Sequence, residues 1–311
     1  MGVVVRVPAT SANLGPGFDA LGLALSLYDE VAAEVVAAPG LRVTVAGEGA
    51  GELPTDGKHL VVRAIWATFD ALGVAPPAGL AVTCHNRIPQ ARGLGSSSAA
   101  IVAGVLLARA LAPTSARRLD QAAALELAAQ LEGHPDNVAA CLLGGLTIAW
   151  TSDDAADGAS HDRAGKARAV KLAPAAGIRP TVYVPPEPGL TAAARAALPA
   201  QVPHADAAYT AGRAALLVHA LTQDPAHLLV ATEDRLHQPY RAASTPGTAA
   251  LVARLREAGV AAVVSGAGPS VLALSPVPEE FDPGDGWVRH DLEVDGHGAT
   301  VREGRLVSYA R

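Results

Sequence analysis

The chain of 311 residues has few of the side chains on which several protein classes depend. Aromatic residues make up 4% of it, which leaves few rings on which nucleic acid bases could stack. Cys84 and Cys141 lie in apolar segments without C-x-x-C spacing, so we expect reduced thiols in a cytoplasmic protein. No stretch approaches the ~20 uninterrupted apolar residues of a membrane span, and Arg6 interrupts the N-terminal run where a signal peptide would be apolar.

Excess positive charge is also missing. The formal net charge is −6 and the isoelectric point is near 5.9, which argues against nucleic acid or an anionic membrane as the main partner. Half of the residues are apolar, and the length suits about two domains at ~150 residues each. The polar, non-periodic segment SDDAADGASHDRAGK (152–166) predicts a surface loop and a domain border. We therefore expect domains at 1–155 and 165–311.

Lysine is the last scarce residue, and its absence from one loop is informative. PQARGLGSSSAA (89–100) has the small residues of a phosphate-binding loop, but the chain's lysines, Lys58, Lys166 and Lys171, lie elsewhere. Its glycines would let backbone approach a ligand closely, and the free N–H groups of a following helix would favour an anion. A serine hydroxyl there could bind Mg²⁺. Taken alone, the loop could equally be a tight turn with a serine cap.

The remaining pattern mixes strands and helices without a repeat. Strands are expected at 3–7, 41–47, 80–88 and 181–185, and helices at 59–73, 98–112, 114–133, 206–221 and 247–258. The segment 260–274 predicts a strand, a glycine turn and a second strand. The last 35 or so residues predict a terminal hairpin region.

Four motifs occur in a fixed order: PATSANLGPGFDALGLAL (8–25), the 89–100 loop, EGHPDNVAACLLGG (132–145) and VSGAGPS (264–270). Together they resemble the family of galactose, homoserine, mevalonate and phosphomevalonate (GHMP) kinases. The resemblance implies an α+β fold, with a βαβ unit in an N-terminal ATP domain and a ferredoxin-like C-terminal domain. It also implies that ATP is held without a lysine by Pro89, Gln90, Ala91, Arg92, Gly93, Leu94, Gly95, Ser96, Ser97, Ser98 and Ala99, with Gly266 and Gly268.

The first motif, P-x-T-S-A-N-L-G-x-G-F-D, resembles that of the homoserine kinases within this family. It implies ATP-dependent phosphorylation of L-homoserine in threonine biosynthesis, and a homodimer is the family expectation. Homoserine is a zwitterion, so its site needs an acid and a cation. The resemblance implies substrate contacts at Asn13, Asp19, Thr191, Arg195 and Arg241. The two arginines suit a carboxylate because a guanidinium can pair with both oxygens. Without the resemblance, an asparagine turn and surface arginines would explain these residues equally well.

The third motif carries Glu132, His134, Asp136 and Asn137. By resemblance, Glu132 binds Mg²⁺ together with Ser97, and Asp136 contacts the substrate near its hydroxyl, where its service as a base is open. Glu126 is the alternative metal ligand. His134 and Asn137 would line the substrate pocket, because no second His or Cys lies at a metal-ligand spacing. Gly133 and Asp136 also suit a helix end and a helix start.

Two other functions stay open at this stage. A family kinase acting on mevalonate or a sugar would carry an early lysine or an N-terminal G-E-H motif, and the sequence has neither. A non-catalytic relative with a binding or regulatory role would have lost the loop or the metal-binding acid, yet Gly93, Gly95, Ser97 and Glu132 are all present.

Overall fold

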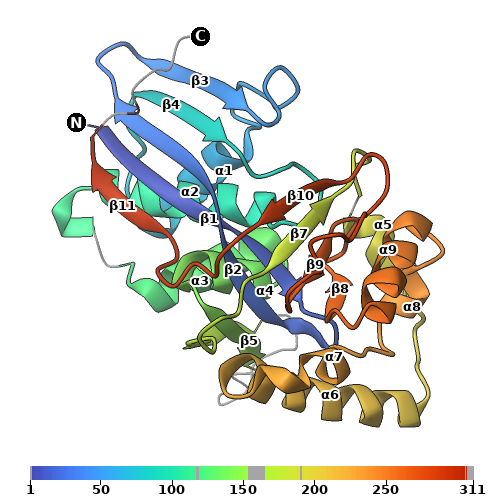
Figure 1. Ribbon diagram of the computed structural model, residues 1–311. Helices are drawn as coiled ribbons and strands as arrows, with labels where there is room; N and C mark the ends of the chain where they lie inside the picture. The colour runs from blue at the N-terminus through green and yellow to red at the C-terminus, as the bar shows by residue number, and fades with distance from the viewer. Residues whose placement is uncertain (1, 117–118, 153–164, 190, 305, 307–311) are drawn as a thin grey trace.

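The computed structural model describes residues 2–116, 119–152, 165–189, 191–304 and 306 as two β-sheets with helices packed on them (Figure 1). A seven-stranded sheet runs in the order β11-β1-β2-β4-β3, and β5 and β6 join it through β2. A four-stranded sheet has the order β10-β7-β9-β8. The predicted α+β class is confirmed.

The longest strands are β1 (Gly2–Asn13) and β2 (Gly17–Val35), which pair antiparallel around a short turn. Valines of β1 are buried on both faces, so this strand lies inside the sheet. The charge of Arg6 is accommodated at the surface, where its guanidinium lies 3.4 Å from the centre of the Tyr28 ring. The first motif (8–25) covers the end of β1, this turn and the start of β2.

The predicted βαβ unit consists of β3 (Gly40–Gly47), α1 (Leu60–Ala71) and β4 (Gly79–Asn86). Strands β3 and β4 are parallel, with Leu41 opposite Leu80, as a helical crossover requires. After β4 the chain enters the 89–100 loop, which leads directly into a helix.

This helix, α2 (Ser96–Leu111), is buried nearly all round, as its sequence predicts, and packs against α1, α3 (Gln121–Glu132), α4 (Asp136–Leu143) and β1. In Figure 1 these helices lie behind the strands of the large sheet. A Cβ at Gly104 would lie 2.5 Å from the carbonyl oxygen of Val61, so glycine allows α1 and α2 to approach closely. The helix predicted over 114–133 begins only at Gln121, because Asp120 accepts the Ala123 N–H and caps it there; 114–116 is a separate 3₁₀ turn.

Strands β5 (Leu146–Ser152) and β6 (Lys166–Leu172) form an antiparallel pair. Strand β5 also pairs with β2, along the edge of β2 opposite β1. Most of the predicted loop at 152–166 lies outside the described residues. The predicted terminal hairpin is wrong: β10 (Val288–Asp291) pairs with β7, and β11 (Thr300–Glu303) pairs with β1. Between them the chain runs beside β2, where Ser26 N–H donates to the Glu293 carbonyl, and so crosses from one sheet to the other.

The second sheet is antiparallel throughout and contains β7 (Thr181–Val184), β8 (Ala262–Val264), β9 (Val271–Ala273) and β10. The strand–turn–strand prediction for 260–274 is confirmed by β8 and β9. Between β7 and β8 lie α5 (Thr191–Ala196), α6 (His204–Thr222), α7 (Leu228–Ala231), α8 (Gln238–Arg241) and α9 (Pro246–Glu257). Since β6 and β11 pair in the large sheet, the range 165–311 contributes to both sheets.

Both cysteines are buried free thiols, and burial raises the pKa of Cys84 to about 12. Among the helices that the structure describes, none combines the length and the apolar character needed to cross a membrane.

Candidate active site

The 89–100 loop takes its shape from glycines that lie against other parts of the chain. Gly95, at φ +68°, immediately precedes α2, and a Cβ there would overlap the Thr10 hydroxyl and lie 3.2 Å from Asn137 Oδ1. At Gly93 a Cβ would overlap the Ser265 carbonyl. Glycine is therefore required here by close packing of the loop on β1 and on the C-terminal motif. The start of α2 has no side-chain cap, so its first N–H groups lie uncapped at the positive end of a 16-residue helix, which suits an anion.

Glu132, at the end of α3, meets the serines at the start of α2. Ser97 Oγ donates to Glu132 Oε1 at 2.6 Å, and Ser98 Oγ donates to the same oxygen at 2.8 Å. The alternative acid, Glu126, lies 3.9 Å from Arg168 instead. Of the two predicted metal ligands, Glu132 is therefore the one beside the loop.

A cavity of about 80 Å³ next to these groups brings the predicted substrate residues together from both halves of the chain. Its lining includes the polar residues Asn13, Asp19, Glu132, His134, Asp136, Asn137, Thr191, Arg195 and Arg241, with Gly266 and the loop residues Arg92, Gly93, Gly95, Ser96 and Ser97. Residues separated by more than 200 positions thus share one cavity, which we call the substrate cavity. Their individual roles stay predictions.

Two of the predicted substrate contacts are paired with each other. Arg195 donates to both oxygens of Asp19, at 2.8 and 2.9 Å. Asp19 has φ +54°, a conformation that is uncommon for a residue with a side chain, and its own N–H donates to Asn13 Oδ1 at 2.9 Å. Asn13 donates in turn to the Gly266 carbonyl at 2.8 Å. The asparagine therefore joins the first motif to the last one, and its amide is already engaged on both sides.

Arg241 differs from Arg195 because it lacks a carboxylate partner among the described residues. Its side chain is buried, with 3% of the residue exposed, and burial lowers its pKa. Nε donates to the Ala194 carbonyl and Nη1 to His237 Nδ1, each at 3.1 Å. Three of the five guanidinium N–H bonds are left for a ligand. The charges of Asp19 and Asp234 offset part of the cost of burying this cation, but its hydrogen-bond partners are neutral, so an anion entering this cavity would be favoured.

Asp136, at the start of α4, is buried and shares a hydrogen bond with its neighbour His134. Asp136 Oδ1 lies 2.7 Å from His134 Nδ1 and accepts the Asn137 N–H at 2.7 Å. This hydrogen bond to Asp136 raises the pKa of His134. Oδ2 has no hydrogen-bond partner in the part of the chain that the structure describes, and it is left for a substrate hydroxyl or ammonium group. Asn137 accepts the Thr10 hydroxyl at 2.7 Å, which fixes it beside Gly95.

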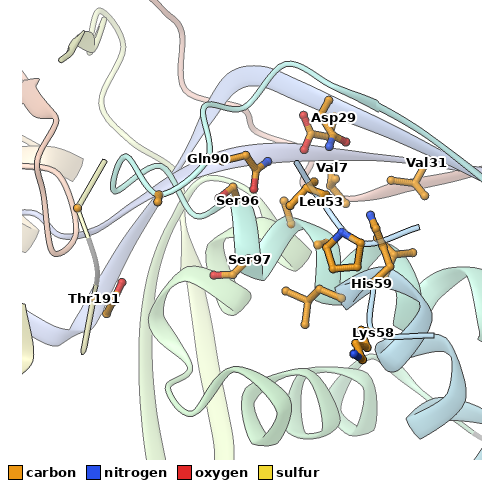
Figure 2. A pocket seen from close by; sticks show the side chains of 18 residues that line it. Val7, Asp29, Val31, Leu53, Lys58, His59, Gln90, Ser96, Ser97 and Thr191 are labelled. Atoms are coloured by element: carbon orange, nitrogen blue, oxygen red, sulfur yellow. The ribbon is translucent and has the colours of Figure 1, made fainter. Parts of the chain in front are cut away.

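A second and larger cavity, of about 360 Å³, lies on the other side of the serines (Figure 2). Its wall is mostly apolar, from residues that include Val7, Val31, Leu53, Pro54, Leu60 and Val61. In Figure 2, Ser96 and Ser97 lie on its left side and His59 on its right. We call it the apolar cavity. It is continuous in its lining with the substrate cavity through Ser96, Ser97 and Thr191.

Two buried titratable groups, His59 and Asp29, line the apolar cavity, and sequence reasoning missed both. His59 is 4% exposed, and neither ring nitrogen has a hydrogen-bond partner among the described residues. Burial lowers the pKa of His59, so the neutral ring offers one donor and one acceptor. Asp29 accepts the N–H groups of Arg87 and Ile88 through Oδ1, and burial raises its pKa to about 6. The sequence signal was weak, since each residue stands beside a charged residue at the edge of an apolar run, Asp29 next to Glu30 and His59 next to Lys58.

The fourth motif (264–270) packs against the 89–100 loop. Ser265 Oγ donates to the Gly93 carbonyl at 2.7 Å, and Gly266 N–H donates to the Ala12 carbonyl at 3.1 Å. On the opposite side, Arg92 donates to the carbonyls of Pro185 and Pro186, so its side chain fixes the loop to the end of β7. The loop is thus held between the two sheets.

Comparison with known proteins matches both halves of the chain. Residues 59–145 fit the model of the GHMP kinases N-terminal domain, and residues 213–282 fit that of the GHMP kinases C-terminal domain. The homoserine kinase of Streptomyces coelicolor is 55% identical over 303 residues, covering 96% of this chain and 94% of the relative. That of Clavibacter michiganensis is 51% identical over 314 residues, covering 96% and 94%. The crystal structure of homoserine kinase from Cytophaga hutchinsonii superposes with a TM-score of 0.80 at 29% identity, with 97% of each chain covered.

Proposed function

The chain belongs to the GHMP kinase family, and from this premise we propose that it transfers the terminal phosphoryl group of ATP to the side-chain hydroxyl of L-homoserine. It is a kinase, and its substrate is a small molecule. The products would be O-phospho-L-homoserine and ADP.

The observation that carries the choice of substrate is the buried guanidinium of Arg241, which has no carboxylate partner among the described residues. Its free N–H bonds favour an anion, and the α-carboxylate of an amino acid can accept from them. Nearby, Asp19 and Asp136 supply negative charge for an ammonium group within the same cavity. Homoserine carries both charges, whereas mevalonate lacks the ammonium group and galactose lacks both.

The apolar cavity fits the nucleoside of ATP. A purine could pack against its apolar wall and pair with the donor and acceptor of His59, whose nitrogens have no partner within the described ranges. The phosphates would then extend past Ser96 and Ser97 to the N-terminus of α2. This direction brings the terminal phosphate toward the substrate cavity, which shares these serines.

The residues beside the loop also suit Mg²⁺. Ser97 Oγ and Glu132 Oε1 are hard oxygen donors, and Mg²⁺ bound to a nucleotide uses one or two carboxylates together with phosphate oxygens. When bound there, the ion would neutralise charge on the phosphates. No cluster of three or more His, Cys, Asp or Glu side chains in the described residues is placed to hold a metal alone, so the phosphates would complete the site.

The protein's part in the transfer is alignment and electrostatic stabilisation. The α2 N–H groups would stabilise the phosphates, and Arg241 would fix the end of the substrate opposite its hydroxyl. Asp136 can accept a hydrogen bond from the hydroxyl through Oδ2, while His134 holds Oδ1. A loose phosphoryl-transfer transition state needs little basic assistance, so Asp136 would act mainly by orientation.

The test is an ADP-release assay with L-homoserine, mevalonate, galactose and L-serine as acceptors. Turnover should need L-homoserine and Mg²⁺ together, and equal turnover with mevalonate would refute the proposal. Arg241→Ala should raise KM for homoserine by roughly ten- to hundredfold, since a charge-assisted hydrogen bond contributes about 1.5–3 kcal/mol. Arg179→Ala is a matched control, because that guanidinium is 71% exposed and pairs with Glu293.

A further inference from the structure

The guanidinium of Arg241 can face the substrate cavity only if hydrogen bonds on its other side hold it in that orientation. Within the described residues, the guanidinium makes two hydrogen bonds, each at 3.1 Å, to the Ala194 carbonyl and to His237 Nδ1. The carbonyl belongs to α5, whereas His237 immediately precedes α8, the short helix that ends at Arg241. His237 itself is fully buried and does not line the substrate cavity.

The direction of these bonds fixes the protonation of the histidine. A guanidinium can only donate, so His237 Nδ1 must be the unprotonated nitrogen that accepts from Arg241. Nε2 then carries the proton and donates to the Gly15 carbonyl at 2.7 Å. The ring is neutral, in agreement with the lowering of its pKa by burial. A protonated ring would lose the bond to Arg241 and oppose a second positive charge at short distance.

The histidine is in turn held from several sides. Asp234 accepts the N–H groups of His237 and Gln238 through Oδ2, at 3.1 and 2.8 Å, which fixes the start of α8. The imidazole stacks on the Phe18 ring with the centroids 5.0 Å apart. Gly15 lies in the turn between β1 and β2, and Phe18 lies at the start of β2. Both come from the first motif, whose residues Asn13 and Asp19 line the substrate cavity, so the orientation of Arg241 is set against that motif.

We propose that His237 is a positioning residue: as the Nε2–H tautomer, it ties the Gly15 carbonyl to the guanidinium of Arg241 and so aims that guanidinium at the substrate carboxylate. This rests on the proposed function, because it takes Arg241 as the carboxylate-binding group. His237 touches neither substrate in this arrangement. Its loss should therefore raise KM for homoserine and leave KM for ATP unchanged.

Two amide variants separate the two nitrogens of the ring. In His237→Asn the side-chain oxygen lies one bond from Cγ, where Nδ1 lay, and can still accept from Arg241. In His237→Gln the amide reaches the position of Nε2 and can still donate to Gly15, but nothing replaces Nδ1. Both variants remove the aromatic ring, so lost stacking on Phe18 is common to both.

We expect His237→Gln to raise KM for homoserine about tenfold more than His237→Asn does, the size of one charge-assisted hydrogen bond. KM for ATP should be equal in the two variants. In an Arg241→Ala background, exchanging Asn for Gln at 237 should change nothing further, because the histidine acts through that arginine. Equal KM values in the wild-type background, or a Gln–Asn difference that persists without Arg241, would overturn the proposal.

The wild-type protein supplies a measurement that does not depend on how well the variants fold. Nitrogen-15 NMR of labelled histidine should show the His237 ring protonated at Nε2 and unprotonated at Nδ1 near pH 7. A proton on Nδ1 would refute the positioning role. Failure of the proposed function has a different signature, since wild-type enzyme would then show no turnover of homoserine whatever the tautomer.

Discussion

Gly95→Ala tests whether the phosphate loop is packed as tightly as the structure shows. Alanine at φ +68° carries a conformational cost of roughly 1–2 kcal/mol. Its methyl group would also overlap the Thr10 hydroxyl, whose displacement breaks the 2.7 Å hydrogen bond to Asn137. Lost hydrogen bonding of about 0.5–1.5 kcal/mol and overpacking of about 1–3 kcal/mol add roughly 2–4 kcal/mol.

Gly73→Ala is the matched control for this substitution. Gly73 has φ +64° at the end of α1, and no atom lies within 4 Å of the added methyl group. Urea unfolding should therefore show the conformational cost alone for Gly73→Ala and the larger loss for Gly95→Ala. A shift of the loop that relieves the strain would distort the ATP site, and a distortion that costs ~1.4 kcal/mol of binding raises KM about tenfold. We therefore expect KM for ATP to rise about tenfold or more in Gly95→Ala and to stay unchanged in Gly73→Ala.

A second-site change checks the cause. In a Thr10→Ala background the overlapping hydroxyl is absent, and the nearest remaining atoms, Thr10 Cβ and Asn137 Oδ1, are 3.2 Å away in the wild-type geometry. Gly95→Ala should then cost about as much as Gly73→Ala. If Gly95→Ala matches Gly73→Ala already in the wild-type background, the close packing is not the reason for the glycine.

Three further predictions concern the buried polar groups. His59→Ala should raise KM for ATP by about two- to tenfold and leave KM for homoserine unchanged, because it removes neutral hydrogen bonds to a purine. Initial rates at varied ATP concentration measure this effect. A change in KM for homoserine alone would contradict it. Asp136→Asn should raise KM for homoserine and lower kcat by less than the ~10²–10⁴ of a lost general base; a larger fall in kcat at unchanged KM would make Asp136 the base. Burial raises the pKa of Asp29 from 3.8 to about 6, so the stability due to its protonated form is present below pH 3.8 and lost as pH rises through 6. The difference in unfolding free energy between Asp29→Asn and wild type should therefore shift in favour of the variant from about pH 4 to pH 7, by up to about 3 kcal/mol. Urea titrations at several pH values measure this difference, and a difference that does not vary with pH would refute the prediction.

The sequence predicted the elements with local signals well. The alternation around Val43 and the helical spacing of 59–73 led to β3 and α1, and the glycine turn of 260–274 to β8 and β9. The end of the chain was misjudged because short polar strands with Gly and Pro carry no information about their partners. Both strand pairings of that region join residues far apart in sequence.

The site residues likewise divide into those that the sequence could predict and those whose partners only the fold reveals. Motif residues such as Ser97 and Glu132 could be found from sequence, and they lie together as expected. The pairing of Arg195 with Asp19 could not be read from either motif, since 176 positions separate the two residues. His59 and His237 are single histidines without a repeat or a metal-ligand spacing. Their significance comes from burial and from the partners that they have or lack, which exist only in the fold.

The return of β11 to the large sheet has a consequence for the order in which this protein can be completed. Without β11, one side of β1 from Val3 to Arg6 has no neighbouring strand, and an open strand edge is a template for pairing with another chain. Translation delivers β11 only after all four motifs have been made. A nascent chain that already contains both nucleotide- and substrate-binding motifs but lacks β11 would therefore expose this edge of β1. Pairing with β11 covers it and leaves a strand of only four residues at this end of the sheet, which offers a much shorter template.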